Sequence, residues 1–159
     1  MLIKPRKWRQ QYGVSLIEAL IALVVLSAGM LGLASLQLNS LKFNQTASFR
    51  SKATGLAYDM LDRMRASATQ ANNGDFAYAT LGSTQTSGSN FAQVQVNDWL
   101  AAIDSALPAG QGRICSASDP SAPLSCDGGP FFVVEVAWSE AQEVNAAMAQ
   151  QSFLLVSRL

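Results

Sequence analysis

Glu18 is an acidic residue inside an otherwise apolar stretch. It lies about one helical turn into the apolar run that follows Gly13. Between Ala19 and Leu36 the chain carries no charged side chain. A lone ionisable group costs roughly 2.5–3.5 kcal/mol at the centre of a membrane-spanning helix and less near its edge. Glu18 is therefore a candidate functional residue, a carboxylate that needs a cationic partner in a medium of low dielectric constant.

Cys115 and Cys126 are the two cysteines, and they stand eleven residues apart. Two thiols in a chain without histidine make a poor zinc site. In an exported domain this pair predicts a disulfide that closes a short loop, and two free thiols are the alternative.

Catalytic chemistry finds little support in the sequence. Histidine, the commonest general base and metal ligand, is absent. The sequence shows no metal-ligand cluster and no phosphate-binding loop, and four aspartates have no evident partners: Asp98, Asp104, Asp119 and Asp127. We therefore expect a protein that is not an enzyme and that needs no metal or other cofactor.

The apolar run from Gly13 to Leu36 is long enough to cross a membrane as a helix, for which about 20 residues are needed. Four basic residues and no acid precede it, which predicts a cytoplasmic N-terminus: Lys4, Arg6, Lys7 and Arg9. Two alternatives remain open. The run could be a secretory signal peptide, with Gly32 and Ala34 as small residues before the cut, or a plain single-span anchor.

Glu18 also has a local alternative role. Ser15 and Glu18 have the S-x-x-E spacing of a capping box, in which each side chain binds a free backbone N–H at the start of a helix. Capping and pairing with a neighbouring molecule can coexist.

Charge argues against nucleic acid as a partner. Without the four basic leader residues, seven basic side chains stand against eleven acidic ones, a formal charge of −4 for residues 14–159. A nucleic-acid interface needs clustered lysine and arginine. Three basic residues lie near one another at Lys42, Arg50 and Lys52, but we interpret them as a solvated helix face.

The apolar pattern predicts one helix from about Ser15 to about Ala71, apolar all round in its first half and on one face in its second. Residues 72–90 are rich in Gly, Ser, Thr and Asn and predict a surface connection. A second helix is expected from Phe91 to Leu107. Strands are expected at Arg113–Ser116, Phe131–Trp138 and Ser152–Arg158, with a short helical turn at Ala146–Ala149. In the central strand, Glu135 fits a sheet with one face on the long helix and the other turned outward.

The N-terminal region resembles a type IV prepilin signal: a basic leader, Gly13, and an apolar helix with Glu18 at its fifth position. The resemblance implies cleavage between Gly13 and Val14 by a prepilin peptidase, N-methylation of Val14, and a charge role for Glu18 in subunit assembly. Principal filament subunits of the family usually have Phe where this chain has Val14. The segments VSLIEALIALVVLSAGMLGLASLQ and DMLDRMRA are similar to PilV-type minor pilins, the type IV pilus modification proteins.

The expected fold class is α+β: a long N-terminal helix packed on a small antiparallel sheet. The predicted boundaries are a leader at 1–13, a transmembrane or filament-core half at 14–36, an amphipathic half at 37–71 and a globular head at 72–159. The head should contain a loop, the second helix, the sheet and the disulfide loop.

The resemblance implies a minor pilin that primes or caps a type IV pilus with other minor pilins and the major pilin, and that supports display of a large tip adhesin, adhesion and twitching motility. Its other partners would be the prepilin peptidase, the inner-membrane assembly machinery and, before assembly, membrane lipid. The expected location is the inner membrane, with a cytoplasmic N-terminus and a periplasmic head, and then the pilus (fimbrium). A pseudopilin of a type II secretion system is the alternative.

Overall fold

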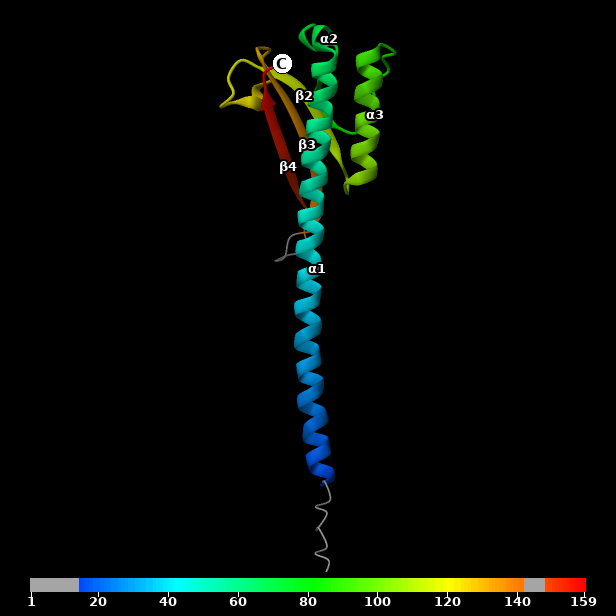
Figure 1. The fold of residues 1–159 in the computed structure, drawn as a ribbon, viewed down its shortest axis with the longest axis vertical. Helices are drawn as coiled ribbons and strands as arrows, with labels where there is room; N and C mark the ends of the chain where they lie inside the picture. Colours follow the sequence, from blue (N-terminus) through cyan, green and yellow to red (C-terminus); the bar gives the residue numbers. More distant parts are fainter. Residues whose placement is uncertain (1–14, 142–147) are drawn as a thin grey trace, which may run out of the picture. The chain divides into compact units, whose positions relative to one another are not determined.

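The computed structural model describes residues 15–141 and 148–159. The chain divides into two compact units, Met1–Phe43 and Asn44–Leu159, which we call the apolar unit and the head unit. The longest element, α1 (Leu16–Ala66), contributes residues to both units (Figure 1). The prediction of a long N-terminal helix packed on a small antiparallel sheet, an α+β fold, is confirmed.

The predicted first helix is correct in position but ends early. Ser67 leaves the helical conformation, with φ −127° and ψ 48°, and a separate short helix, α2 (Ala68–Asn72), follows. The expectation of one helix to Ala71 is therefore wrong for its last turn. The backbone N–H of Ser67 donates to the carbonyl of Met64, three residues back, at 3.1 Å, so a 3-10-type hydrogen bond replaces the α-helical bond to Arg63 at this turn.

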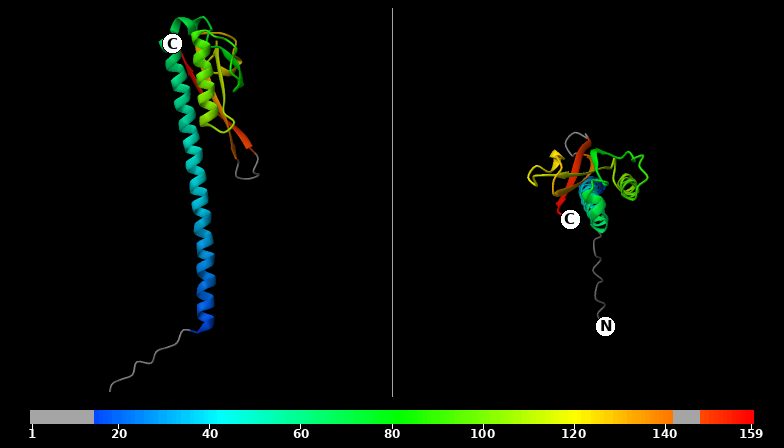
Figure 2. Two further views of the ribbon diagram at one scale, coloured as in Figure 1. Left: turned by 90° about the vertical axis from the view of Figure 1, so that its right-hand side faces the viewer. Right: turned by 90° about the horizontal axis from the view of Figure 1, so that it is seen from above.

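The second predicted helix is α3 (Phe91–Ala106). It begins where the Asn90 side chain accepts a hydrogen bond from the backbone N–H of Gln93, at 2.8 Å, the usual arrangement of an N-cap. It ends before Leu107, whose backbone is extended, and Pro108 follows. In Figure 2, α3 lies beside the C-terminal part of α1, and the two helices share one face of the sheet.

The sheet is a four-stranded antiparallel meander in the order β1-β2-β3-β4. Its strands are β1 (Tyr78–Gly82), β2 (Gln111–Ala117), β3 (Phe131–Ala141) and β4 (Met148–Ser157), and a short 3-10 helix, η1 (Pro123–Ser125), lies between β2 and β3. The three predicted strands are present and longer than expected. Strand β1 corrects the interpretation of residues 72–90 as a connection.

The predicted helical turn at Ala146–Ala149 is not supported where it can be checked. Met148 and Ala149 belong to β4 and pair with Ala141 and Glu140. The first two residues of that turn lie outside the described residues. The two residues of the predicted turn that the structure describes are therefore in a strand and not in a helix.

The main core of the head unit lies between the sheet and the two helices. Most of its members come from three places: one face of α1 (Ala53, Ala57, Met60, Met64), one face of α3 (Ala92, Val96, Trp99, Leu100, Ile103), and alternate sheet residues (Ile114, Val134, Val136, Trp138). Ala71, Phe76 and Leu107 complete it. Each helix and strand buries in this core the face that its sequence periodicity predicts to be apolar.

The opposite face of the sheet is not the simple solvent-facing surface that the sequence predicts. Cys115, Ala117 and Val133 form a second buried cluster there, with Cys126 packed against it. Glu135 lies on the same face and is only 4% exposed. The chain between β2 and β3 folds back over part of this face, and the disulfide holds it there.

Candidate functional site

The apolar unit has the composition of a helix that needs an outside partner. All its large apolar side chains from Leu16 to Phe43 are exposed, among them Leu16, Ile17, Leu20, Ile21, Leu23, Val24, Val25, Leu26, Met30, Leu31, Leu33, Leu36, Leu38, Leu41 and Phe43. Within the described residues, α1 is the one helix long and apolar enough to cross a membrane. A soluble monomer rarely exposes so large a continuous apolar surface, so this helix segment calls for lipid or a bundle of other helices.

Glu18 lies in the first turn of α1 and is exposed. It shares a helix face with Ile17, Ile21, Ala22 and Val25. In residues 15–141 and 148–159 its carboxylate accepts no hydrogen bond and forms no ion pair, and neither side-chain bond of the predicted capping box is formed. Helix geometry is instead maintained by the backbone, with the N–H of Ala19 donating to the carbonyl of Ser15 at 3.2 Å. The position favours a carboxylate through the helix dipole and leaves its oxygens available to another molecule.

Small residues in the apolar unit leave room for close approach by another helix. A Cβ atom built on Gly29 or Gly32 would meet no atom within 4 Å. Neither glycine is therefore required by a contact within the described chain, although each costs about 1 kcal/mol of helix stability relative to Ala. Small residues at such positions let helices pack closely in a membrane.

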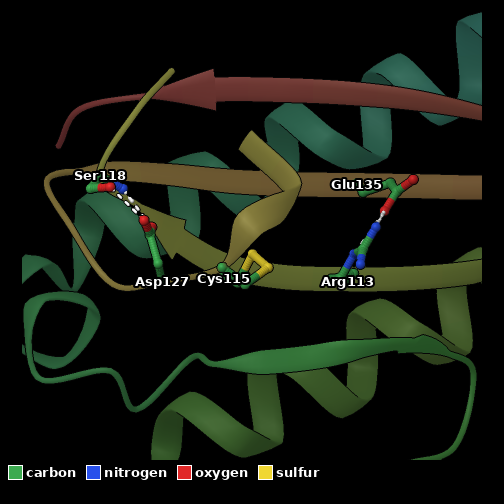
Figure 3. Close-up of a disulfide and its surroundings, with 6 residues drawn as sticks. Arg113, Cys115, Ser118, Asp127 and Glu135 are labelled. Carbon is green, nitrogen blue, oxygen red and sulfur yellow. Dashed lines mark hydrogen bonds and ion pairs between the residues drawn. A yellow bond between two sulfur atoms is a disulfide. The ribbon is translucent and has the colours of Figure 1, made fainter. Parts of the chain in front are cut away.

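The head unit is closed by a disulfide between Cys115 on β2 and Cys126, whose Cα atoms lie 5.4 Å apart (Figure 3). The bond agrees with the disulfide predicted from the spacing of the two cysteines. A disulfide that closes a loop of about 15 residues contributes about 3 kcal/mol in the chain-entropy model, and this shorter loop gives somewhat less.

Two aspartates, Asp119 inside the disulfide loop and Asp127 directly after it, form hydrogen bonds to serines within the loop. The hydroxyl and the backbone N–H of Ser118 both donate to the carboxylate of Asp127, with the N–H at 2.8 Å (Figure 3). These hydrogen bonds hold the pKa of Asp127 below its usual value of 3.8. Hydrogen bonds from the hydroxyl and N–H of Ser121 lower the pKa of Asp119 in the same way. The sequence analysis found no partners for these two acids. In the structure, each carboxylate is bonded to a serine nearby in the sequence, Ser118 for Asp127 and Ser121 for Asp119.

Residues 8–34 match the family model described as the prokaryotic N-terminal methylation motif. This match indicates a type IV pilin-like prepilin. It supports a type IV pilin or a pseudopilin, and together with the long apolar helix it suits a pilin anchored in the inner membrane. Searches of curated proteins and of solved structures found no match to the chain.

The matched segment contains Gly13, Val14 and Glu18. Gly13 and Val14 lie outside the described residues, so cleavage and methylation at this bond stay predictions. Glu18 is separated from the disulfide in sequence and belongs to the other unit. The predicted residues that the structure describes therefore belong to two separate features, Glu18 to the apolar unit and the disulfide to the head unit.

Proposed function

We propose that this prepilin is a PilV-type minor pilin, which is cleaved after Gly13, methylated at Val14 and inserted into a type IV pilus. The observation that carries the proposal is a combination of three features of the N-terminal segment: the methylation motif, the apolar side chains exposed on all sides of α1 before Asn44, and the carboxylate of Glu18, which has no partner among the described residues. Lipid covers the apolar surface before assembly, and a bundle of pilin helices buries it afterwards.

In the proposed filament, Glu18 pairs with the free amine of a neighbouring subunit's first residue. The carboxylate and the amine both lose their hydrating water in the bundle, so burying either charge without the other is unfavourable in free energy. Removing one partner of a buried ion pair costs roughly 3–5 kcal/mol, because the remaining charge has no compensation. The pair therefore selects the axial register at which helices enter the bundle.

The proposed partners are the prepilin peptidase, the inner-membrane assembly machinery, the major pilin and the other minor pilins. With these the protein primes or caps the pilus, supports display of a large tip adhesin, and so contributes to adhesion and twitching motility. The N-terminus is cytoplasmic and the head periplasmic until assembly moves the head to the cell surface.

The test is the substitution Glu18→Gln, which removes the charge and keeps a side chain suited to a capping box. We expect normal cleavage after Gly13 and at least a tenfold fall in the ratio of this protein in sheared pili to that in the inner membrane, since 1.4 kcal/mol already corresponds to a factor of about ten. Ser15→Ala is the matched control, because it removes the capping hydroxyl and leaves the carboxylate.

Wild-type incorporation of processed Glu18→Gln would contradict the charge pair. A loss of incorporation in Ser15→Ala, together with wild-type incorporation of Glu18→Gln, would assign both residues to capping. If the wild-type protein is absent from sheared pili and present in a secretion pseudopilus, the result would favour the assignment as a pseudopilin of a type II secretion system.

A further inference from the structure

Two buried tryptophans of the head unit differ in how their indole N–H groups are satisfied. The Nε1 atom of Trp99 donates to the backbone carbonyl of Leu56 at 2.8 Å. Trp138 is only 2% exposed, and its Nε1 atom has no acceptor among the residues that the structure describes. A buried donor without a partner costs more than the net gain of an ordinary hydrogen bond, so Trp138 requires an explanation.

Trp138 lines a cavity of about 490 Å³ between α1 and the β3–β4 edge of the sheet. Its lining residues are Arg50, Thr54, Trp138, Gln151, Ser152 and Phe153, all of which belong to the head unit. Gln151 on β4 lies directly opposite Trp138 on β3 in the strand register. Arg50 is exposed, and among these described lining residues it is the one cationic side chain.

The side chains around this cavity offer mainly donors. The indole N–H of Trp138 and the guanidinium of Arg50 can only donate, whereas the amide of Gln151 and the hydroxyl of Ser152 can donate or accept. The hydroxyl proton of Thr54 is already given to the backbone carbonyl of Arg50, at 2.8 Å. A ligand for this set must bring acceptors, and a planar guanidinium matches a carboxylate better than it matches a single neutral oxygen.

We propose that this cavity is a carboxylate-binding site, in which one ligand oxygen accepts from Trp138 and the carboxylate faces Arg50. Glu140 follows Trp138 by two residues on the same face of β3, and one of its oxygens is also buried without a partner among the described residues. Glu140 does not line the cavity. Among the described residues, Glu140 is an acid that could compete for Arg50 from within the chain, so the test must separate it from a ligand.

The same chemistry has two sources: a free small carboxylate, or an Asp or Glu side chain of a neighbouring subunit. The second source rests on the proposed assembly into a filament, and the first does not. The site itself can therefore be tested on the purified chain, whether or not the protein is a pilin.

The first experiment follows the indole N–H signals of the full chain, labelled with 15N-tryptophan, in detergent micelles. Sodium acetate is added against sodium chloride of equal ionic strength and against neutral acetamide, and Trp138→Phe assigns the signal. We expect acetate alone to move the Trp138 signal saturably, while the Trp99 signal stays fixed because its donor is already bonded. Arg50→Gln should weaken acetate binding at least tenfold, whereas Lys52→Gln, two residues along the same helix and outside the cavity lining, should not change it.

A Trp138 signal that responds no more to acetate than to chloride would overturn the proposal. Equal acetate affinity in Arg50→Gln and in the unmodified chain would overturn it as well, because the charge would then play no part. Both results would leave the pilus assignment unaffected.

The second experiment identifies the source by carbodiimide cross-linking of the Arg50→Lys variant in membranes and sheared pili. The new amine and a nearby carboxylate condense to an amide, and the carbodiimide takes up the water to become a urea. Products present in Arg50→Lys and absent from Arg50→Gln report on position 50 alone. A link to another subunit assigns the ligand to that subunit; no new link, together with the acetate response, assigns a free carboxylate. A link to Glu140 of the same chain would show that the protein fills its own site, and would overturn the proposal.

Discussion

Arg113 on β2 and Glu135 on β3 lie directly opposite each other, with Arg113 Nε 2.8 Å from Glu135 Oε2. The Glu135 side chain is 6% exposed and that of Arg113 is 20% exposed. The pair stands on the sheet face away from the helices, in a row that continues to Cys115 and Val133. A nearly buried carboxylate is thus neutralised across two strands, and the bond can form only in this register.

Breaking this pair from one side should destabilise the head unit more than removing it entirely. We expect Arg113→Met to lower the free energy of unfolding by roughly 3–5 kcal/mol, because Glu135 keeps a buried charge without a partner. The double variant Arg113→Met, Glu135→Leu should recover most of that loss. Urea unfolding followed by near-ultraviolet circular dichroism measures both. A double variant as unstable as the sum of its single variants would contradict this view of the pair.

Acid should loosen the disulfide loop through Asp127. Hydrogen bonds from Ser118 lower the pKa of this group below 3.8 in the folded chain, so they stabilise the fold above that pH. The contribution is lost as the pH falls through the lower, folded-state pKa, when the carboxylate gains its proton. An NMR titration of the carboxyl carbons should show the pKa of Asp127 rising toward 3.8 in Ser118→Ala.

Asp119 provides an internal control for the same titration, since Ser121 lowers its pKa. Its titration should keep its low midpoint in Ser118→Ala. The variant keeps the backbone N–H of residue 118, so an unchanged titration of Asp127 would show that the Ser118 hydroxyl does not stabilise the charged form.

Removing residues 1–43 should leave a soluble, folded head. The large apolar side chains of α1 that remain unburied are concentrated before Asn44, whereas Ala53, Ala57, Met60 and Met64 are covered in the head unit. The 44–159 fragment should stay monomeric in size-exclusion chromatography and show mixed helix and strand content by circular dichroism. Aggregation in every buffer, or the spectrum of a disordered chain, would contradict the division into two units.

Local sequence patterns predict the parts of the fold that depend on local physics. The recurrence of Ala53, Ala57, Met60 and Met64 at helical spacing identifies the buried face of α1, and it lies where the periodicity requires. The run Phe131–Trp138 identifies the central strand for a similar reason. A basic leader, a glycine and an apolar run likewise identify the candidate assembly segment, because each of them is a property of neighbouring residues.

Features that depend on long-range pairing could not be read from the sequence. Strand β1 (Tyr78–Gly82) has no buried residue and lacks an alternating pattern; its pairing with β2 defines it. The partner of Glu135 depends on strand register, which places Arg113 opposite it. The sequence does not show what surrounds the indole N–H of each tryptophan. That of Trp99 donates to the backbone carbonyl of Leu56 on α1, whereas Trp138 lines a cavity.

The central claim, that this chain matures as a pilin, is tested most directly at its N-terminus. Intact-mass and peptide mass spectrometry of the protein from membranes and sheared pili would read the first residue and its modification. We predict a chain that begins at Val14 and carries an N-methyl group. A mature chain that begins at Ser35, or one that retains Met1 in a strain with an active prepilin peptidase, would contradict the account.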